Sequence, residues 1–100
     1  MRQHDPLTPA EAERIAMLVE ECGEVVHAAM KTLRHGYDSY DPTAAVAESN
    51  RAMLAREISD LIMKIRWMAH KGDIPIGWLV EACNKPLTVP RYSYHQTEEA

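Results

Sequence analysis

The segment TPAEAERIAMLVEECGEVVHAAMKTLRHG, residues 8–36, carries the clearest structural signal in this chain. Thr8 followed by Pro9 and Glu11 is typical of a helix start, with an N-cap, a proline at the first helical position and a capping box. Gly36 supplies a C-terminal stop. Between these ends, apolar residues recur every three or four positions and predict one long amphipathic helix. Its apolar stripe consists of Ile15, Leu18, Val19, Cys22, Val25, Val26, Ala29, Met30 and Leu33.

The rest of the chain continues this helical pattern. A second long helix is expected from Asn50, as its cap, to near Gly72, because apolar residues again recur at the helical period. A shorter helix is expected between Asp73 and Pro86, where a proline ends it. Thirteen alanines, four glycines and no phenylalanine favour helix over sheet throughout. We therefore predict an all-α fold.

One hundred residues make a single domain, residues 1–100, because a second domain could not bury a core of its own. Within it we expect a loop and a short helix at about 37–49, the helix spanning residues 42–48, and a tail from about residue 90. Two long helices and a short one cover only one side of each apolar stripe. The predicted solution is a helical hairpin that assembles into a four-helix bundle, as a homodimer or homotetramer.

The composition excludes several classes of partner. Eleven basic residues against fifteen acidic ones give a net charge of −4, which offers no field for a nucleic-acid backbone. The longest apolar run, Ile15–Val19, has five residues, whereas a membrane helix needs roughly 20. No charged and apolar leader opens the chain, and Cys22 and Cys83 form no paired motif. We expect a cytoplasmic protein with both cysteines reduced and in the core.

Carboxylates gather on both predicted long helices. Glu21 and Glu24 project together from the flank of the first stripe. Glu57 falls inside the apolar stripe of the second helix, with Asp60 beside it, and a carboxylate on an inward face needs a partner. Four such groups in one cleft repel one another, and oxygen ligands of this kind are those that Mg²⁺ prefers. The sequence therefore predicts a metal site at these four residues.

The same residues lie in motifs that resemble those of a known family. EECGE at 20–24 followed by EISD at 57–60 is similar to the Glu-Glu-x-x-Glu and Glu-x-x-Asp motifs of the MazG-like all-α nucleoside triphosphate pyrophosphohydrolases. KTLRHG at 31–36 and RYSYHQ at 91–96 are similar to two further motifs of the small phage-borne members. The resemblance covers roughly residues 18–96.

The resemblance implies an enzyme that hydrolyses a ribo- or deoxyribonucleoside triphosphate to the monophosphate and pyrophosphate. It implies Mg²⁺ as the cofactor, with Mn²⁺ as a substitute. The family's metal ligands correspond to Glu21, Glu24, Glu57 and Asp60, and Glu20 would orient a water, so that these five residues are the catalytic candidates. A phage-borne protein of this kind would act in the cytoplasm of its host.

Basic and aromatic residues outside the acidic set are candidates to bind the substrate. Arginine matches phosphate oxygens with its fork geometry, lysine supplies a point charge, and a tyrosine can stack on a base. The candidates are Lys31, Arg34, Tyr37, Lys85, Arg91 and Tyr92. The last three are supported in particular by the similarity of the chain's ending to that of the family. By contrast, Lys64 is expected to be solvated and Trp67 to lie at an interface.

Two rival functions are compatible with the same residues. One is a phosphoribosyl-ATP pyrophosphohydrolase-like enzyme, a related helical class with similar acidic motifs, which a substrate panel would separate. The other is a non-enzymatic helical adaptor whose acidic cleft binds a basic partner or a structural metal. That protein would capture its partner without turnover.

Overall fold

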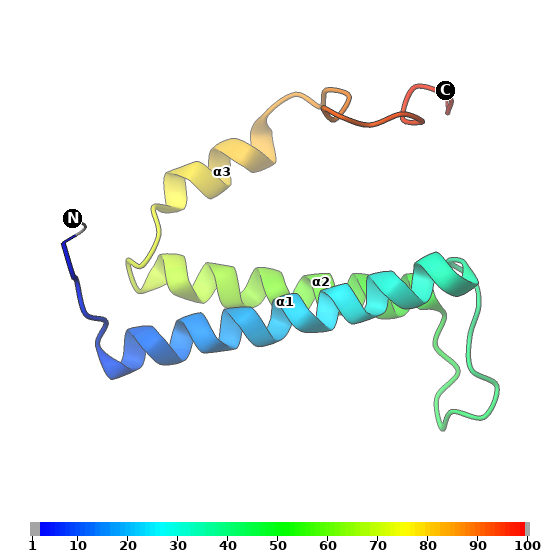
Figure 1. Cartoon of the computed structure of the whole chain (residues 1–100), viewed down its shortest axis with the longest axis horizontal. Coiled ribbons are helices and arrows are strands. Elements are labelled where there is room, and N and C mark those ends of the chain that lie inside the picture. Colours follow the sequence, from blue (N-terminus) through cyan, green and yellow to red (C-terminus); the bar gives the residue numbers. More distant parts are fainter. Residues whose placement is uncertain (1–2, 100) are drawn as a thin grey trace.

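The computed structural model describes residues 3–99 as three helices joined by loops (Figure 1). They are α1 (Pro9–His35), α2 (Asn50–His70) and α3 (Ile76–Asn84). No strand occurs within the described residues. The all-α prediction is confirmed, and so is the helical hairpin, because α1 and α2 lie side by side and run in opposite directions (Figure 1).

The ends of α1 form as the sequence predicts. The Thr8 side chain accepts a hydrogen bond from the Glu11 backbone N–H at 3.1 Å, and the Thr8 N–H donates to the Glu11 carboxylate at 2.8 Å, which completes the capping box. At the other end the Gly36 N–H donates to the Thr32 carbonyl at 2.8 Å. Gly36 has a φ of 86°, a conformation that glycine adopts without strain. The helix therefore ends at His35, because the positive φ of Gly36 does not continue a right-handed helix.

The start of α2 differs by one residue from the prediction. Ser49 is the N-cap, because its hydroxyl accepts from the Ala52 N–H at 3.1 Å. Asn50 is buried and its side-chain amide donates to the Gly36 carbonyl at 3.0 Å. The Asn50 N–H also donates to the Ser39 carbonyl at 2.9 Å. Asn50 thus holds the two ends of the connecting loop together instead of capping the helix.

The short helix predicted over residues 42–48 is absent, and this prediction was wrong. The Asp41 carboxylate accepts from both the backbone N–H and the hydroxyl of Thr43, at 2.9 and 2.6 Å. These two bonds also hold the pKa of the Asp41 carboxyl below its ordinary value. The bond from the Thr43 N–H is also the one that an N-cap accepts at a helix start. Here it accompanies a single turn, in which the Ala44 N–H donates to the Asp41 carbonyl at 3.2 Å, and the segment after Pro42 continues as turns and bends.

An ion pair fixes the connection between α2 and α3. The Arg14 guanidinium on α1 donates twice to the Asp73 carboxylate, at 2.5 and 2.9 Å, and both side chains are largely shielded from solvent. Beyond it α3 contacts α2 but not α1, and it diverges from the hairpin together with the tail (Figure 1). The radius of gyration is 17.5 Å, whereas a compact domain of this length has about 13 Å. The isolated chain is therefore an open structure.

Each predicted apolar stripe is only partly covered. On α1, Leu18, Val25 and Ala28 lie toward α2, but the other side of the stripe is exposed. Cys22 and Cys83 are also exposed, so their placement in the core was wrong. At 100° per residue, the exposed parts of both stripes turn to the same side of the hairpin. We call this side the apolar face. It consists of Ile15, Val19, Val26, Met30, Leu33, Ile58 and Ile62.

Candidate metal centre

The hairpin brings together three carboxylates from the two acidic motifs. One oxygen from each of Glu21, Glu57 and Asp60 can be chosen so that all three lie within 4.8 Å of one another. We call these three residues the acidic cluster. Glu57 is buried on the α1-facing side of α2, with its side chain 12% exposed, Glu21 is half-buried and Asp60 is exposed. The inward placement of Glu57 that the sequence predicts is confirmed.

Two other predicted catalytic residues lie outside this cluster. Glu20 and Glu24 belong to the same stretch of α1 as Glu21, and both are exposed. Neither contributes to the group of oxygens within 4.8 Å, as far as the described residues show. Of the four predicted ligands, the structure therefore brings three together and leaves out Glu24. The roles of Glu20 and Glu24 stay predictions.

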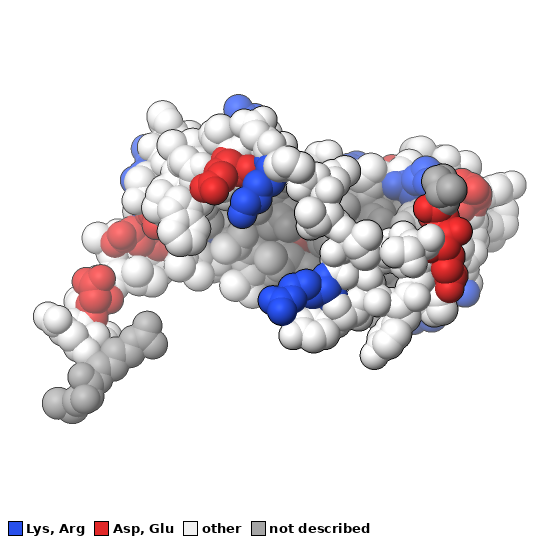
Figure 2. Space-filling view, turned by 90° about the horizontal axis from the view of Figure 1, so that it is seen from above, with Lys and Arg blue, Asp and Glu red and all other residues white. Residues whose placement is uncertain are grey.

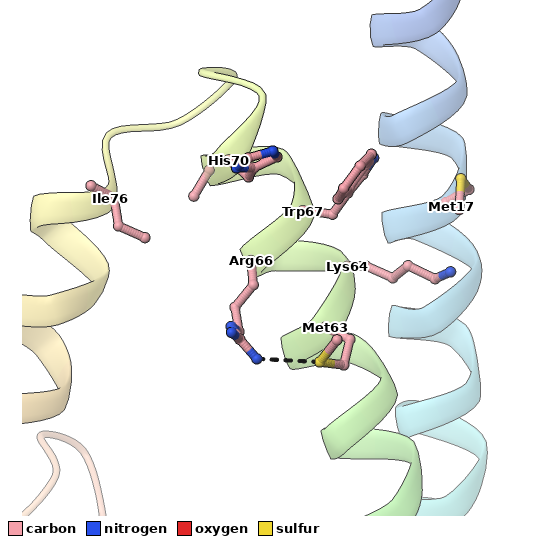
Figure 3. A pocket seen from close by; sticks show the side chains of 8 residues that line it. Met17, Met63, Lys64, Arg66, Trp67, His70 and Ile76 are labelled. Atoms are coloured by element: carbon pink, nitrogen blue, oxygen red, sulfur yellow. Dashed lines mark hydrogen bonds between the residues drawn. The ribbon is translucent and has the colours of Figure 1, made fainter.

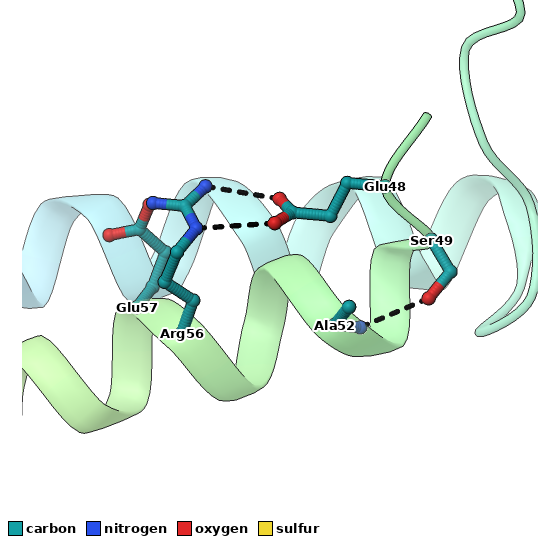
Figure 4. A network of polar contacts seen from close by, with 5 residues as sticks. All are labelled: Glu48, Ser49, Ala52, Arg56 and Glu57. Atoms are coloured by element: carbon teal, nitrogen blue, oxygen red, sulfur yellow. Dashed lines mark hydrogen bonds and ion pairs between the residues drawn. The ribbon is translucent and has the colours of Figure 1, made fainter. Parts of the chain in front are cut away.

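Arg56 links the acidic cluster to the loop before α2, a contact that the sequence analysis missed (Figure 4). Its Nη1 donates to Glu57 at 3.0 Å, while its Nη2 and Nε donate to the two oxygens of Glu48 at 3.1 and 3.3 Å. The pKa of the Arg56 guanidinium is raised, mainly by its hydrogen bond to Glu48 and further by the negative charge of Glu57. A basic residue directly before an inward glutamate was the available signal. Arg56 offsets part of the charge of the cluster.

The donor set of the acidic cluster fits a hard divalent cation. All three ligands are carboxylate oxygens, which suit Mg²⁺, Ca²⁺ and Mn²⁺ and disfavour metals that prefer sulfur or imidazole. Oxygens on opposite sides of an octahedral Mg²⁺ lie about 4.2 Å apart, twice the usual bond length of about 2.1 Å. Small rotations of the side chains would therefore close the cluster onto such an ion. Glu21, Glu57 and Asp60 are the residues that can hold it.

The predicted substrate-binding residues are spread over three parts of the chain. Lys31 is half-buried and lines a cavity of about 510 Å³ between the hairpin and its connecting loop. Arg34 and Tyr37 are exposed, and the Tyr37 ring lies 4.4 Å below the Arg51 guanidinium. The remaining three follow α3 and are exposed, with the Arg91 guanidinium 5.7 Å from the Tyr92 ring. They are Lys85, Arg91 and Tyr92.

Comparisons with protein-family models, with characterised proteins and with solved structures found no match. The MazG-like family therefore stays a prediction from the motifs. Among the helices of residues 3–99, none combines the length and apolar character needed to cross a bilayer. Seen from the α3 side, the surface is hollowed, and side chains of both charges lie around the hollow (Figure 2).

Proposed function

We propose that this protein is a Mg²⁺-dependent nucleoside triphosphate pyrophosphohydrolase, which converts a (d)NTP and water into a (d)NMP and pyrophosphate. One observation carries the proposal: residues that lie 36 positions apart in two separate acidic motifs meet across the hairpin, with the buried Glu57 beside Glu21. A buried carboxylate among like charges is costly unless a cation accompanies it. The motif resemblance supplies the reaction class.

The residues of the site would divide the work of hydrolysis. Glu21, Glu57 and Asp60 would hold the ion, which, when bound, supplies positive charge to offset that of the triphosphate oxygens. Glu20 is exposed on α1 next to Glu21, where its carboxylate would orient the attacking water and accept its proton, and Glu24, also exposed on α1, would add a fourth ligand. Arg56 remains paired with Glu48, so it keeps the connecting loop beside the site.

The proposed active form is a homodimer or homotetramer built around a four-helix bundle. The chain has 8825 Å² of accessible surface, whereas a compact monomer of 11.3 kDa has about 5,700 Å². The excess of about 3,100 Å² exceeds the roughly 800 Å² that each partner buries in a standard interface. Pairing two apolar faces would cover part of this surface and leave both acidic clusters open, because the cluster lies on the opposite side of the hairpin.

A substrate panel tests the proposal. The purified protein is incubated with each ribo- and deoxyribonucleoside triphosphate and Mg²⁺, and the products are scored for pyrophosphate against orthophosphate. We expect pyrophosphate and the monophosphate from at least one substrate. Orthophosphate as the only product would contradict the proposed cleavage. Turnover of phosphoribosyl-ATP alone would favour the related helical enzyme instead.

One observation favours the non-enzymatic alternative. Glu57 already has a cationic partner in Arg56, at 3.0 Å, so its burial can be explained by an ion pair without a metal. However, Arg56 is half exposed and makes two of its three contacts with Glu48. Its single bond to Glu57 leaves Glu21 and Asp60 without a cationic partner among the ion pairs of the described residues. We therefore retain the metal-dependent enzyme as the proposed function.

A further inference from the structure

A cavity of about 840 Å³ is lined by residues of α1, of the second half of α2 and of the start of α3, beyond the acidic cluster along α2 (Figure 3). Its lining is mainly apolar and includes Met17 of α1, Met63 and Trp67 of α2, and Ile76 of α3. Lys64 and Arg66 also line it and add positive charge. A cavity of this size, mainly apolar with a few polar groups, is typical of a small-molecule site. The mechanism proposed above makes no use of it.

A row of side chains along one side of α2 leads from the acidic cluster to the cavity. We call this row the ridge. Asp60, Lys64, Trp67 and Lys71 stand at positions i, i+4, i+7 and i+11, which share one side of a helix. Lys64 is half-buried, Trp67 is 49% exposed, and the Lys71 ammonium lies 4.9 Å from the centre of the Trp67 ring. Asp60 and Trp67 are separated by about 10 Å along the helix axis, at 1.5 Å per residue.

The order of groups along this ridge matches one kind of ligand. At one end three carboxylates can hold a cation, which would offer positive charge to phosphate oxygens. Lys64 comes next and supplies a further positive charge for phosphate. Trp67 follows, half exposed and lining the mainly apolar cavity beside the His70 ring, whose centre lies 5.3 Å from its own, and such a site suits an aromatic ring. A nucleoside triphosphate carries phosphates at one end and an aromatic base at the other, in the same order.

We infer that the cavity beside Trp67 is the nucleobase subsite of this protein, with the base stacked on the Trp67 ring. The inference rests on the proposed function and adds to it the residue that recognises the base. In Figure 3 the Trp67 ring projects from α2 toward α1, and Trp67 is part of the cavity lining. Stacking on a tryptophan is tolerant of base identity, because every base has a flat aromatic face. Discrimination between bases then falls to the polar groups around the ring.

The test compares a ligand that has a base with one that lacks it. Binding of the α,β-imido analogues of the four deoxyribonucleoside triphosphates, and of inorganic tripolyphosphate, is measured by calorimetry with Mg²⁺ present. The proteins are the wild type, Trp67→Leu, Trp67→Phe and the control Trp78→Leu. Trp78 is 77% exposed on α3 and does not line the cavity. Circular dichroism and light scattering check the helix content and the oligomeric mass of each variant.

We expect Trp67→Leu to weaken binding of the nucleotide analogues by about 5- to 150-fold, the range observed when a stacked aromatic is removed. Tripolyphosphate affinity should not change, Trp67→Phe should restore most of the nucleotide affinity, and Trp78→Leu should match the wild type. Unchanged nucleotide affinity in Trp67→Leu would overturn the subsite and leave the proposed function standing. Equal weakening of both ligands would also overturn it, because Trp67 would then support the phosphate end or the fold.

Two further outcomes are informative. A lower oligomeric mass in Trp67→Leu with unchanged nucleotide affinity would show that a second copy of the chain occupies the cavity, and would overturn the subsite. A wild-type protein that binds neither the analogues nor tripolyphosphate would overturn both the subsite and the proposed function. The two failures are therefore distinguishable, because only the second affects the wild type.

Discussion

Replacing Glu57 by glutamine separates a metal ligand from a structural carboxylate. The substitution keeps the side-chain volume and removes one negative charge from the acidic cluster. Two charges 4.8 Å apart repel by about 0.9 kcal/mol in bulk water and by about 3.5 kcal/mol at an effective dielectric of 20. Because Asp60 is exposed and Glu21 only half-buried, the lower value is the better guide to both pairs. Without a metal, Glu57→Gln should therefore relieve roughly 1–2 kcal/mol of repulsion.

The stability lost by removing the ion pair between Glu57 and Arg56 is small. Arg56 keeps its two hydrogen bonds to Glu48, and the glutamine carbonyl can still accept the third. The charge of Arg56 is therefore not stranded, and ion pairs with a half-exposed partner contribute little. For a domain of this size, 1 kcal/mol corresponds to about 4–8 °C in Tm. We expect Glu57→Gln to raise the Tm by several degrees in excess chelator.

With Mg²⁺ present, we expect Glu57→Gln to impair the protein, because the substitution removes a metal ligand. Losing one of three carboxylate ligands should weaken Mg²⁺ binding by at least the roughly 10–100-fold that loss of an outer-sphere partner costs. Turnover should fall accordingly. Glu81→Gln, the same change at an exposed position on α3, serves as the control and should alter neither quantity. A lower Tm in chelator together with a near-normal rate in saturating Mg²⁺ would show that Glu57 is the partner of Arg56 and no metal ligand.

Three further outcomes follow from the structure. Turnover should vanish in excess chelator and return with Mg²⁺ or Mn²⁺, as measured by pyrophosphate release; undiminished turnover would exclude a metal. Light scattering at micromolar concentration should give at least twice 11.3 kDa, and Val26→Glu on the apolar face should lower that mass, whereas a helical wild-type monomer would contradict the bundle. The pKa of Asp73 lies below its ordinary 3.8 because Arg14 donates to it, so its ion pair stabilises the fold above that pH and is lost as the pH falls through the lowered value. Asp73→Asn should therefore lower the Tm at pH 7 and flatten its decline in acid, and parallel curves for both proteins would refute this role.

The ends of the helices could be predicted from the sequence because the residues that start and stop a helix act on their immediate neighbours. The capping box at Thr8 and the glycine at position 36 act within one turn, so the bounds of α1 follow from the sequence. The segment after Asp41 was misassigned because the bond from the Thr43 N–H to the Asp41 carboxylate forms in an isolated turn as well as at a helix start, so the capping signal does not distinguish the two. Asn50 was misassigned as a cap because its partner, the Gly36 carbonyl, lies across the loop.

The candidate site was predictable only where its residues departed from the local pattern. Glu57 stood out because a carboxylate interrupts an apolar stripe, and the structure buries it. The division of each stripe between the hairpin contact and the apolar face was not predictable, because it depends on how the two helices are rotated against each other. The contact between Arg56 and Glu48 depends on the path of the connecting loop. Contacts and rotations of this kind cannot be predicted from the spacing of residue types along the sequence.

The sparse core of the single chain ties its folding to its concentration. Among the described residues, Ala28 and Met68 are the only apolar side chains that are buried. Such a core cannot offset the conformational entropy that one hundred residues lose on ordering. On the proposed assembly, most of the stabilisation comes from contacts between copies, so folding and association form one equilibrium. Dilution should then unfold the protein, and at low abundance the chain would be exposed to proteases as it is made.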